Sequence, residues 1–362
     1  HNADCGKCRL QCFKGLLSMK NQLISLTGLA MLATSSSASA HHGFAAHFDP
    51  GQLTRIEGTI KQFDFINPHG FLYIDTVNDA GEPVVYVCDL QARTQLARRG
   101  VDQTLFTVGE SIIVEGFPAR RDPYGCEFGT GYFADGSSYT MRSTDEARTQ
   151  FAENQEIPLM PGASRSIFGT WIRPGMFGDA SGRGESTGEE SITPAGRAAQ
   201  DAFDPIADNP VVHCEAGSPV RSWGPPGLAT SITQVGNEIL IYHESMDVTR
   251  IIHMDMDAHP TDIERSDMGH SIGRLVDGTL IIDTAGFSEG VLRGSTLNTD
   301  QMTMVERLSI QENTGRLVIS WVVNEPVYYS EPLTGSQQLQ STDKEIIRYD
   351  CIPGSPMSYQ QH

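Results

Sequence analysis

The sequence predicts a mainly β protein, in which an OB-like small barrel is followed by a calycin or lipocalin-like antiparallel β-barrel. Three observations lead to this fold class. Short apolar runs that alternate with polar residues recur along the chain, Gly-rich turn sequences separate many of them, and helix signals occur in two short segments. Period-two alternation is typical of half-buried strands, and many short strands with regular turns are typical of barrels and sandwiches.

Residues 19–40 have the three-part pattern of a secretory signal peptide. A positive region begins at Met19, residues 23–32 are mostly apolar, and small residues lead up to Ala40. The apolar run is shorter than the about 20 residues that span a bilayer, and no later run comes closer, so no membrane span is expected. We expect a periplasmic or secreted protein whose mature chain begins at His41, with cleavage after Ala38 as the alternative. Because the first residue is His rather than Met, residues 1–18 are expected to be translated upstream sequence.

Four cysteines follow the predicted signal peptide: Cys88, Cys126, Cys214 and Cys351. An even number of cysteines in an exported chain predicts disulfides. Three pairings are compatible with the sequence, and the division into domains described below favours Cys88 with Cys126 and Cys214 with Cys351.

The formal net charge of −19 argues against some classes of partner. Such a surface repels phosphate backbones and anionic membranes, so no nucleic-acid partner is expected. The sequence contains no phosphate-binding loop and no dinucleotide fingerprint, so no nucleotide cofactor is expected. A small-molecule partner is compatible with these observations, and nothing in the sequence identifies a protein partner.

The first domain is predicted to occupy residues 41–143. A helix is predicted after its third strand, with Asp89 as the N-cap and Gly100 after the last turn. Five short strands with a helix after the third are typical of an OB-like barrel. The strand candidates are residues 55–65, 71–76, 84–88 and 111–117, with a last strand near Tyr132 or Tyr139.

Residues 144–165 are polar and irregular, and are expected to link the first domain to a second one, residues 166–362. Thr193-Pro194 signals the start of a short helix. Eight strands joined in order would form an up-and-down barrel able to enclose a small ligand. The eight candidates are residues 231–235, 238–244, 249–254, 271–276, 279–284, 302–311, 316–323 and 344–349.

Several motifs resemble known sequences. His41-His42-Gly43-Phe44, Glu57-Gly58-Thr59-Ile60 and Asn67-Pro68-His69 are similar to an uncharacterised family of exported bacterial proteins with an Ala-His-His-Ser start. Phe168-Gly169-Thr170-Trp171, Gly269-His270-Ser271-Ile272-Gly273-Arg274 and Asp277-Gly278-Thr279-Leu280 resemble a module found beside that family or alone. The resemblance covers most of the predicted mature chain and implies no activity, because the family has none assigned. Gly43 stands where the family has Ser, and Leu275 where Trp is expected.

Histidines near the predicted mature N-terminus suggest a metal site. Cleavage after Ala40 would give His41 a free α-amine, which can chelate a metal ion together with the Nδ1 atom of its own ring. His42, His47 and His69 supply further imidazole nitrogen. Such ligands suit Cu(II) and Zn(II), and copper ranks highest in the Irving–Williams order, so copper (or zinc) is the predicted metal. The alternative is an unstructured His-rich tip, with His69 in a turn that Pro68 enforces.

A second set of ionisable residues lies in phase with apolar strand residues, which predicts that they point into the second barrel. A carboxyl group among apolar side chains has a raised pKa, so Glu306 with His253, His270 and Asp283 is the candidate acid–base group. An ion pair of Glu306 with Arg274 or Arg250 is the structural alternative. The candidates for lining a ligand site are Arg274, Asp255, His243, Tyr328 and Trp321.

Three functions are compatible with these features. The leading hypothesis is an exported binding or accessory protein, with copper at the His41 end and a small ligand in the second barrel. The competing hypothesis is a β-barrel enzyme of lyase, isomerase or hydrolase type. The third is a structural or assembly module, in which both barrels are filled by their own side chains.

Overall fold

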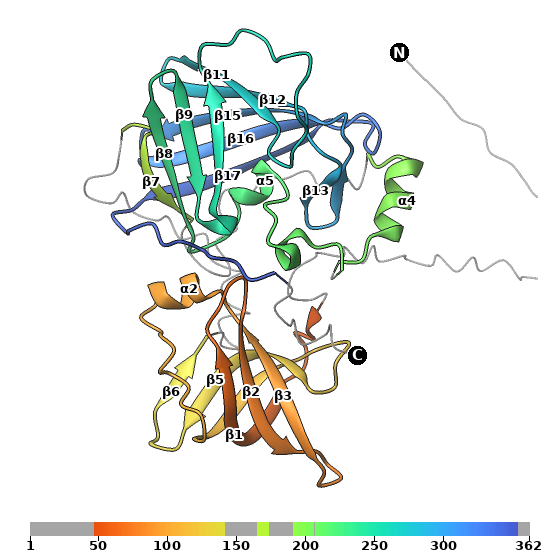
Figure 1. Cartoon of the computed structure of the whole chain (residues 1–362), viewed down its shortest axis with the longest axis vertical. Helices are drawn as coiled ribbons and strands as arrows, with labels where there is room; N and C mark the ends of the chain where they lie inside the picture. Colours follow the sequence, from red (N-terminus) through yellow and green to blue (C-terminus); the bar gives the residue numbers. More distant parts are fainter. Residues whose placement is uncertain (1–46, 142–164, 174–190, 206, 354–362) are drawn as a thin grey trace, which may run out of the picture. The chain divides into compact units, whose positions relative to one another are not determined.

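The computed structural model describes residues 47–141, 165–173, 191–205 and 207–353. The described residues are 47% strand and 10% helix, and form a closed five-stranded barrel followed by a closed nine-stranded barrel (Figure 1). This confirms the predicted fold class. The predicted signal peptide and nearly all of the predicted linker lie outside the described residues. Within those residues, no helix is long and apolar enough to cross a membrane.

The first barrel has the strand order β3-β2-β1-β4-β5 and is closed by a parallel pairing of β5 with β3. Helix α2 follows the third strand as predicted, but Asp89 does not cap it, because Asp89 is buried within β3 and the N-cap is Ala92. Ile60, Leu72 and Phe128 are among the side chains that form the core. The elements are β1 (Thr54–Asp64), β2 (Gly70–Val77), β3 (Pro83–Leu90), α2 (Arg93–Arg98), β4 (Ser111–Pro118), β5 (Gly125–Phe133) and β6 (Ser138–Thr140).

The second barrel has the strand order β10-β11-β12-β15-β16-β17-β7-β8-β9. Neighbouring strands are antiparallel except β10 and β11, which are parallel because the connection of residues 254–269 returns the chain to the same end of the wall. The barrel strands are β7 (Gly169–Ile172), β8 (Ala229–Val235), β9 (Glu238–His243), β10 (Val248–His253), β11 (His270–Val276), β12 (Thr279–Ala285), β15 (Thr303–Gln311), β16 (Arg316–Asn324) and β17 (Leu333–Ser341).

Several short elements are not part of the barrel wall. Helix α4 begins after Thr193, whose side chain accepts a hydrogen bond from the Gly196 N–H, as the Thr-Pro signal predicts. The elements are α4 (Pro194–Ala202), η1 (Pro210–His213), α5 (Pro219–Ser222), η2 (Ser245–Asp247), and the hairpin of β13 (Gly290–Arg293) and β14 (Thr296–Asn298).

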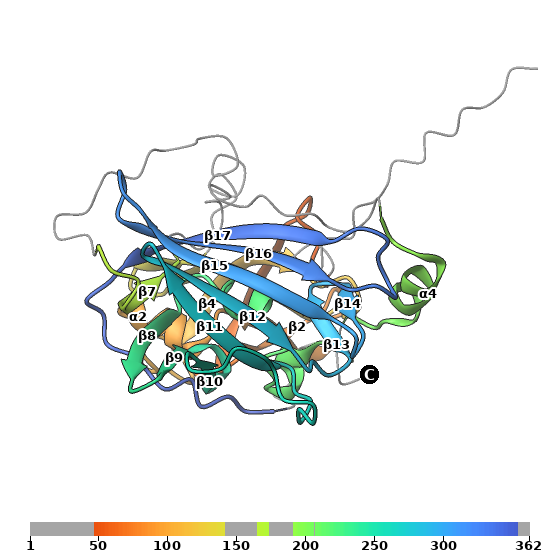
Figure 2. The ribbon, with the colours of Figure 1, turned by 90° about the horizontal axis from the view of Figure 1, so that it is seen from above.

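The core of the second barrel contains a large cluster of buried aliphatic and aromatic side chains. Trp171, Ile241, Ile282 and Ile319 are each at most 1% exposed, and Trp223 after α5 belongs to the same cluster. Figure 2 shows β15, β16 and β17 lying side by side in the wall.

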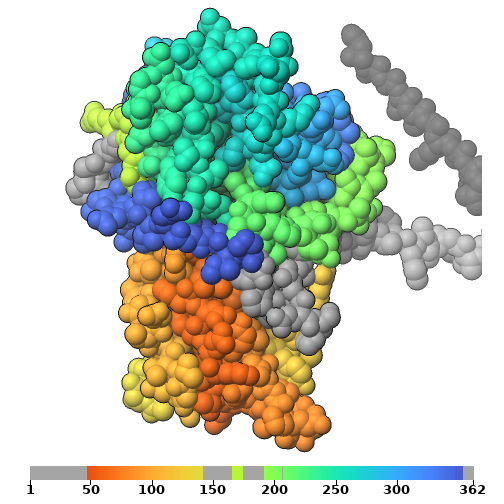
Figure 3. Space-filling model, viewed as in Figure 1, coloured from red at the N-terminus to blue at the C-terminus, as the bar shows by residue number. Residues whose placement is uncertain are grey.

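The predicted strand at residues 344–349 is wrong. The backbone N–H of Ile347 donates to the Glu244 carboxylate at 2.6 Å, and that of Tyr349 donates to Asp247 at 2.9 Å. Because carboxylates take these donors, the segment does not join a sheet. The segment forms a dark-blue band on the surface of the molecule in Figure 3.

Both predicted disulfides are present. Cys88 is bonded to Cys126 inside the first barrel, where the two residues are also partners in the β3–β5 pairing. Cys214 follows η1 and is bonded to Cys351 in the C-terminal segment. The pairing favoured by the domain division is therefore confirmed.

Candidate functional site

The carboxylate of Glu306 is completely buried and belongs to an ion pair. Glu306 Oε2 lies 2.5 Å from Arg250 Nη1, and Glu306 Oε1 accepts a hydrogen bond of 2.8 Å from the Trp223 indole. Arg250 also donates to Ser271 Oγ at 2.9 Å and to Thr284 Oγ1 at 2.6 Å. Of the two ion-pair partners predicted for Glu306, the structure has Arg250. The pair and its hydrogen-bond partners form a buried polar network in the barrel core.

His243 points into the same core, as its strand phase predicts. Its ring contacts the Trp223 ring edge-on with centroids 4.7 Å apart, and its Nδ1 lies 2.9 Å from Thr230 Oγ1. Burial, with a smaller contribution from Arg250, lowers the pKa of His243 to about 3. At neutral pH this imidazole is uncharged, and it therefore adds no charge to the core.

The predicted inward direction is wrong for His253, Asp255, His270, Arg274 and Asp283. In β11 the buried positions are Ser271 and Gly273, while Arg274 is exposed. In β12 the inward positions next to Asp283 are Ile282 and Thr284. Alternation identifies the residues that share a face, but here apolar residues such as Ile251, 43% exposed, also occur on the outer face.

The outward-facing histidines instead form a cluster with a third histidine from a loop. His259, in the connection between β10 and β11, has its Nδ1 2.9 Å from His270 Nδ1 and its Nε2 3.2 Å from Asp283 Oδ1. The ring of His253 stacks on His270, with centroids 5.0 Å apart and an interplanar angle of 18°. His253 Nδ1 also lies 3.4 Å from Glu238 Oε1. Burial, followed by His253 and His259, lowers the pKa of His270.

His259 was not among the predicted site residues. It lies in Asp257-Ala258-His259-Pro260, where no alternation indicates a strand or a buried face. The only available signal is that His253 and His270, which flank the same connection, are also histidines. The structure therefore joins three of the four predicted acid–base residues with His259, and separates them from Glu306.

The predicted ligand-lining aromatic residues pack against other side chains. Trp321 is 4% exposed and lies against Gly335, where an added Cβ would overlap the indole. Tyr328 is half-buried against the core, and its hydroxyl lies 3.4 Å from Glu289 Oε1.

In the first barrel, His69 lies close enough to His47 for the charge of one imidazole to disfavour protonation of the other. Burial, followed by His47, lowers the pKa of His69 to about 4, against a hydrogen bond to the Leu90 backbone that raises it. His41 and His42 lie outside the described residues. Within the described part of the chain, no group of three or more His, Cys, Asp or Glu side chains has the arrangement of a metal site.

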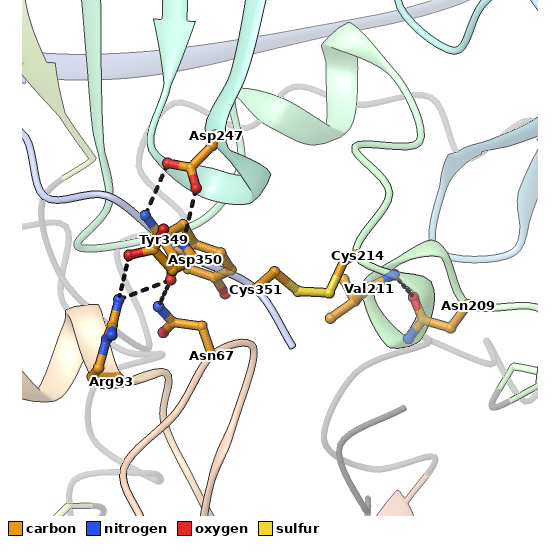
Figure 4. The surroundings of a disulfide bond; sticks show 9 residues. All are labelled: Asn67, Arg93, Asn209, Val211, Cys214, Asp247, Tyr349, Asp350 and Cys351. Carbon is orange, nitrogen blue, oxygen red and sulfur yellow. Dashed lines mark hydrogen bonds and ion pairs between the residues drawn. A yellow bond between two sulfur atoms is a disulfide. The ribbon is translucent and has the colours of Figure 1, made fainter. Parts of the chain in front are cut away.

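Asn67, of the Asn-Pro-His motif, has a structural role. Its buried amide donates to Thr94 Oγ1 at 3.0 Å, and its Oδ1 accepts from the Thr94 N–H. The same amide also donates to the Tyr349 carbonyl (Figure 4). Arg93 donates to the same Tyr349 carbonyl at 3.0 Å. The motif thus binds the C-terminal segment to the first barrel, next to the Cys214–Cys351 disulfide.

Comparison with known families finds a match for the N-terminal part of the chain. Residues 29–127 match the sequence model of DUF6152, a family of unknown function. The match ends within β5, so it covers most of the first barrel and none of the second. It agrees with the predicted kinship to an uncharacterised family. No curated protein matches the chain.

Proposed function

We propose that the protein is an exported binding or accessory protein that holds a divalent metal ion, copper in the first place, with histidines of the first barrel. The observation that supports this most directly is the state of His69, whose pKa is lowered to about 4 by burial and by His47. The ring is therefore neutral at physiological pH. Because one ring nitrogen hydrogen-bonds to the Leu90 backbone as a donor, the neutral ring has its lone pair on the other nitrogen, as in metal-bound histidines.

His47 is the second candidate ligand, and the α-amine and ring of His41 with the ring of His42 are proposed to complete the site. Two disulfides support the exported location, since such bonds are typical of oxidising compartments. A small ligand inside the second barrel has less support, because aliphatic and aromatic side chains occupy its core.

The test is intact-mass analysis of the exported protein, followed by copper titration under native conditions. We expect a chain that begins at His41 and that binds one more copper ion than His69→Ala or His47→Ala. The matched control is His213→Ala, because His213 is an exposed histidine elsewhere in the chain. A chain that begins at Ser39, or equal copper binding by the wild type and both variants, would contradict the proposal.

A further inference from the structure

We propose that His259 and His270 form a separate site for a divalent transition-metal ion with tetragonal geometry, of the Cu(II) type, on the outer face of the second barrel. The two ring nitrogens that face each other belong to the connection after β10 and to the first residue of β11. The site consists only of described residues. It goes beyond the proposed function, which concerns the first barrel.

The hydrogen bond to Asp283 sets the tautomer of His259. A carboxylate only accepts, so the Nε2 of His259 must carry the hydrogen in the 3.2 Å contact with Asp283 Oδ1. In the neutral ring of His259 the Nδ1 atom then has the lone pair, and this atom lies 2.9 Å from the Nδ1 of His270. In the metal-free protein, a hydrogen on His270 Nδ1 can bridge the two nitrogens. When a metal ion takes the place of that hydrogen, the His270 ring carries its proton on Nε2 instead, and both Nδ1 atoms become ligands.

The separation of the two nitrogens indicates the geometry of the ion. Imidazole nitrogen binds such metals at about 2.0–2.1 Å, so two ligands at right angles are about 2.8–3.0 Å apart, and two at a tetrahedral angle about 3.3–3.4 Å. The 2.9 Å between His259 Nδ1 and His270 Nδ1 is an ordinary hydrogen-bond length, and it is also the separation that two ligands at a right angle need, so such an ion fits without a change in this distance. Right-angled nitrogen ligands are typical of Cu(II) and Ni(II), whereas Zn(II) prefers the tetrahedral arrangement.

Neighbouring groups hold both rings in place. Asp283 orients His259, as carboxylates commonly orient metal-bound histidines, and the stacked ring of His253 supports His270. Glu238 in turn holds His253. The side chains of His253 and His259 are 29% and 18% exposed, so an ion can approach from solvent and keep water in its remaining positions.

Nearby charge also favours a cation. Asp283 and Glu238 contact the cluster, and the whole chain has a net charge of −19. Such a surface attracts cations and raises their local concentration.

The experiment is titration of the mature chain with Cu(II), followed by electron paramagnetic resonance, in a background that carries His41→Ala, His42→Ala, His47→Ala and His69→Ala and so lacks the histidines of the proposed first-barrel site. We expect one bound copper ion with a tetragonal spectrum and nitrogen hyperfine structure. His259→Gln and His270→Gln should each abolish it, while Asp283→Ala should weaken binding by about 10- to 100-fold, because it only orients His259. His213→Gln is the control and should bind as the parent does.

Circular dichroism of each variant establishes that the barrel is folded. A copper signal that survives both His259→Gln and His270→Gln, or a spectrum of tetrahedrally distorted copper, would overturn the inference. If His69→Ala instead binds as much copper as the wild type and the His259 and His270 variants lose their ion, the first-barrel proposal fails and this site stands.

Discussion

At the scale of single residues, Glu306 is the clearest case in which a charged group stabilises the fold. Its carboxylate and the Arg250 guanidinium are 0% and 1% exposed, and each has further hydrogen-bond partners in the core. Removing one partner of a buried pair is costly because the other charge is left uncompensated.

Glu306→Gln is therefore expected to lower the free energy of unfolding by about 3–5 kcal/mol, measured by urea denaturation. Gln retains an oxygen for the Trp223 indole, so the change tests the charge more than the hydrogen bond. Replacing both residues by Met should cost less than Glu306→Gln alone, since no unpaired charge is then buried. A gain in stability for Glu306→Gln would instead indicate a carboxylate kept for function at the expense of stability.

His243 makes stability depend on pH. Burial, and then Arg250, lower its pKa from 6.5 to about 3. Below about pH 6.5 the His243 imidazole therefore takes up a proton in the unfolded chain and stays uncharged in the folded protein. The contribution of His243 to the free energy of unfolding is complete above that pH and is lost as the pH falls towards 3. The loss amounts to at most ~1.4 kcal/mol per pH unit.

The slope of the unfolding free energy against pH is proportional to the number of protons taken up on unfolding. His243→Gln should accordingly reduce this number by up to one between about pH 3.5 and 6. Urea denaturation at several pH values measures the slope. The exposed His213→Gln is the matched control, and its slope should fall much less. An unchanged slope for His243→Gln would show that its imidazole binds a proton equally in both states.

At the scale of elements, strands with strong local signals were predictable. The Val276-Asp277-Gly278-Thr279 turn joins β11 to β12, and Asp277 and Gly278 both have positive φ, of 50° and 76°, which suits a two-residue hairpin. β17 was missed because its buried positions are Leu333, Gly335, Gln337 and Leu339, an alternation in which only two residues are apolar. Gly335 is required there by the neighbouring Trp321, a contact that the strand's own sequence does not reveal.

The candidate site was predictable only in part, for a related reason. The strand phase correctly placed His270 with Ile272 and Asp283 with Ile281, but Ile272 and Ile281 are on the outer face. Isoleucines thus occur on the outer face of the barrel, where Ile281 is 8% exposed, while an ion pair is fully buried inside it. Both features reverse the usual relation between the polarity of a residue and the side of the wall on which it lies. The contact with His259 depends on the path of a 16-residue connection, which has no period to interpret.

At the scale of the whole molecule, the C-terminal segment connects residues that are far apart in sequence. Its backbone is bound by Asn67, Arg93 and Arg98 from the first barrel, and by Glu244 and Asp247 from the second. Arg98 and Glu244 also form an ion pair with each other, with side chains 7% and 0% exposed. Such contacts join side chains to backbone across more than 100 residues, so no local pattern predicts them.

The Cys214–Cys351 disulfide closes a loop of 137 residues around these contacts. Loop-closure entropy for that length predicts a stabilisation of roughly 5 kcal/mol, and measured values for native disulfides are about 2–5 kcal/mol. Cys214→Ser/Cys351→Ser is therefore expected to lower the free energy of unfolding within that range, measured by denaturant titration.

If the disulfide also holds the C-terminal segment in place, the amides of Ile347, Tyr349 and Asp350 should lose hydrogen-exchange protection in this variant, while the β15–β16 amides keep theirs. Unchanged protection at those three amides would mean that Glu244 and Asp247 hold the segment without the covalent bond, and that the disulfide acts on the unfolded chain alone.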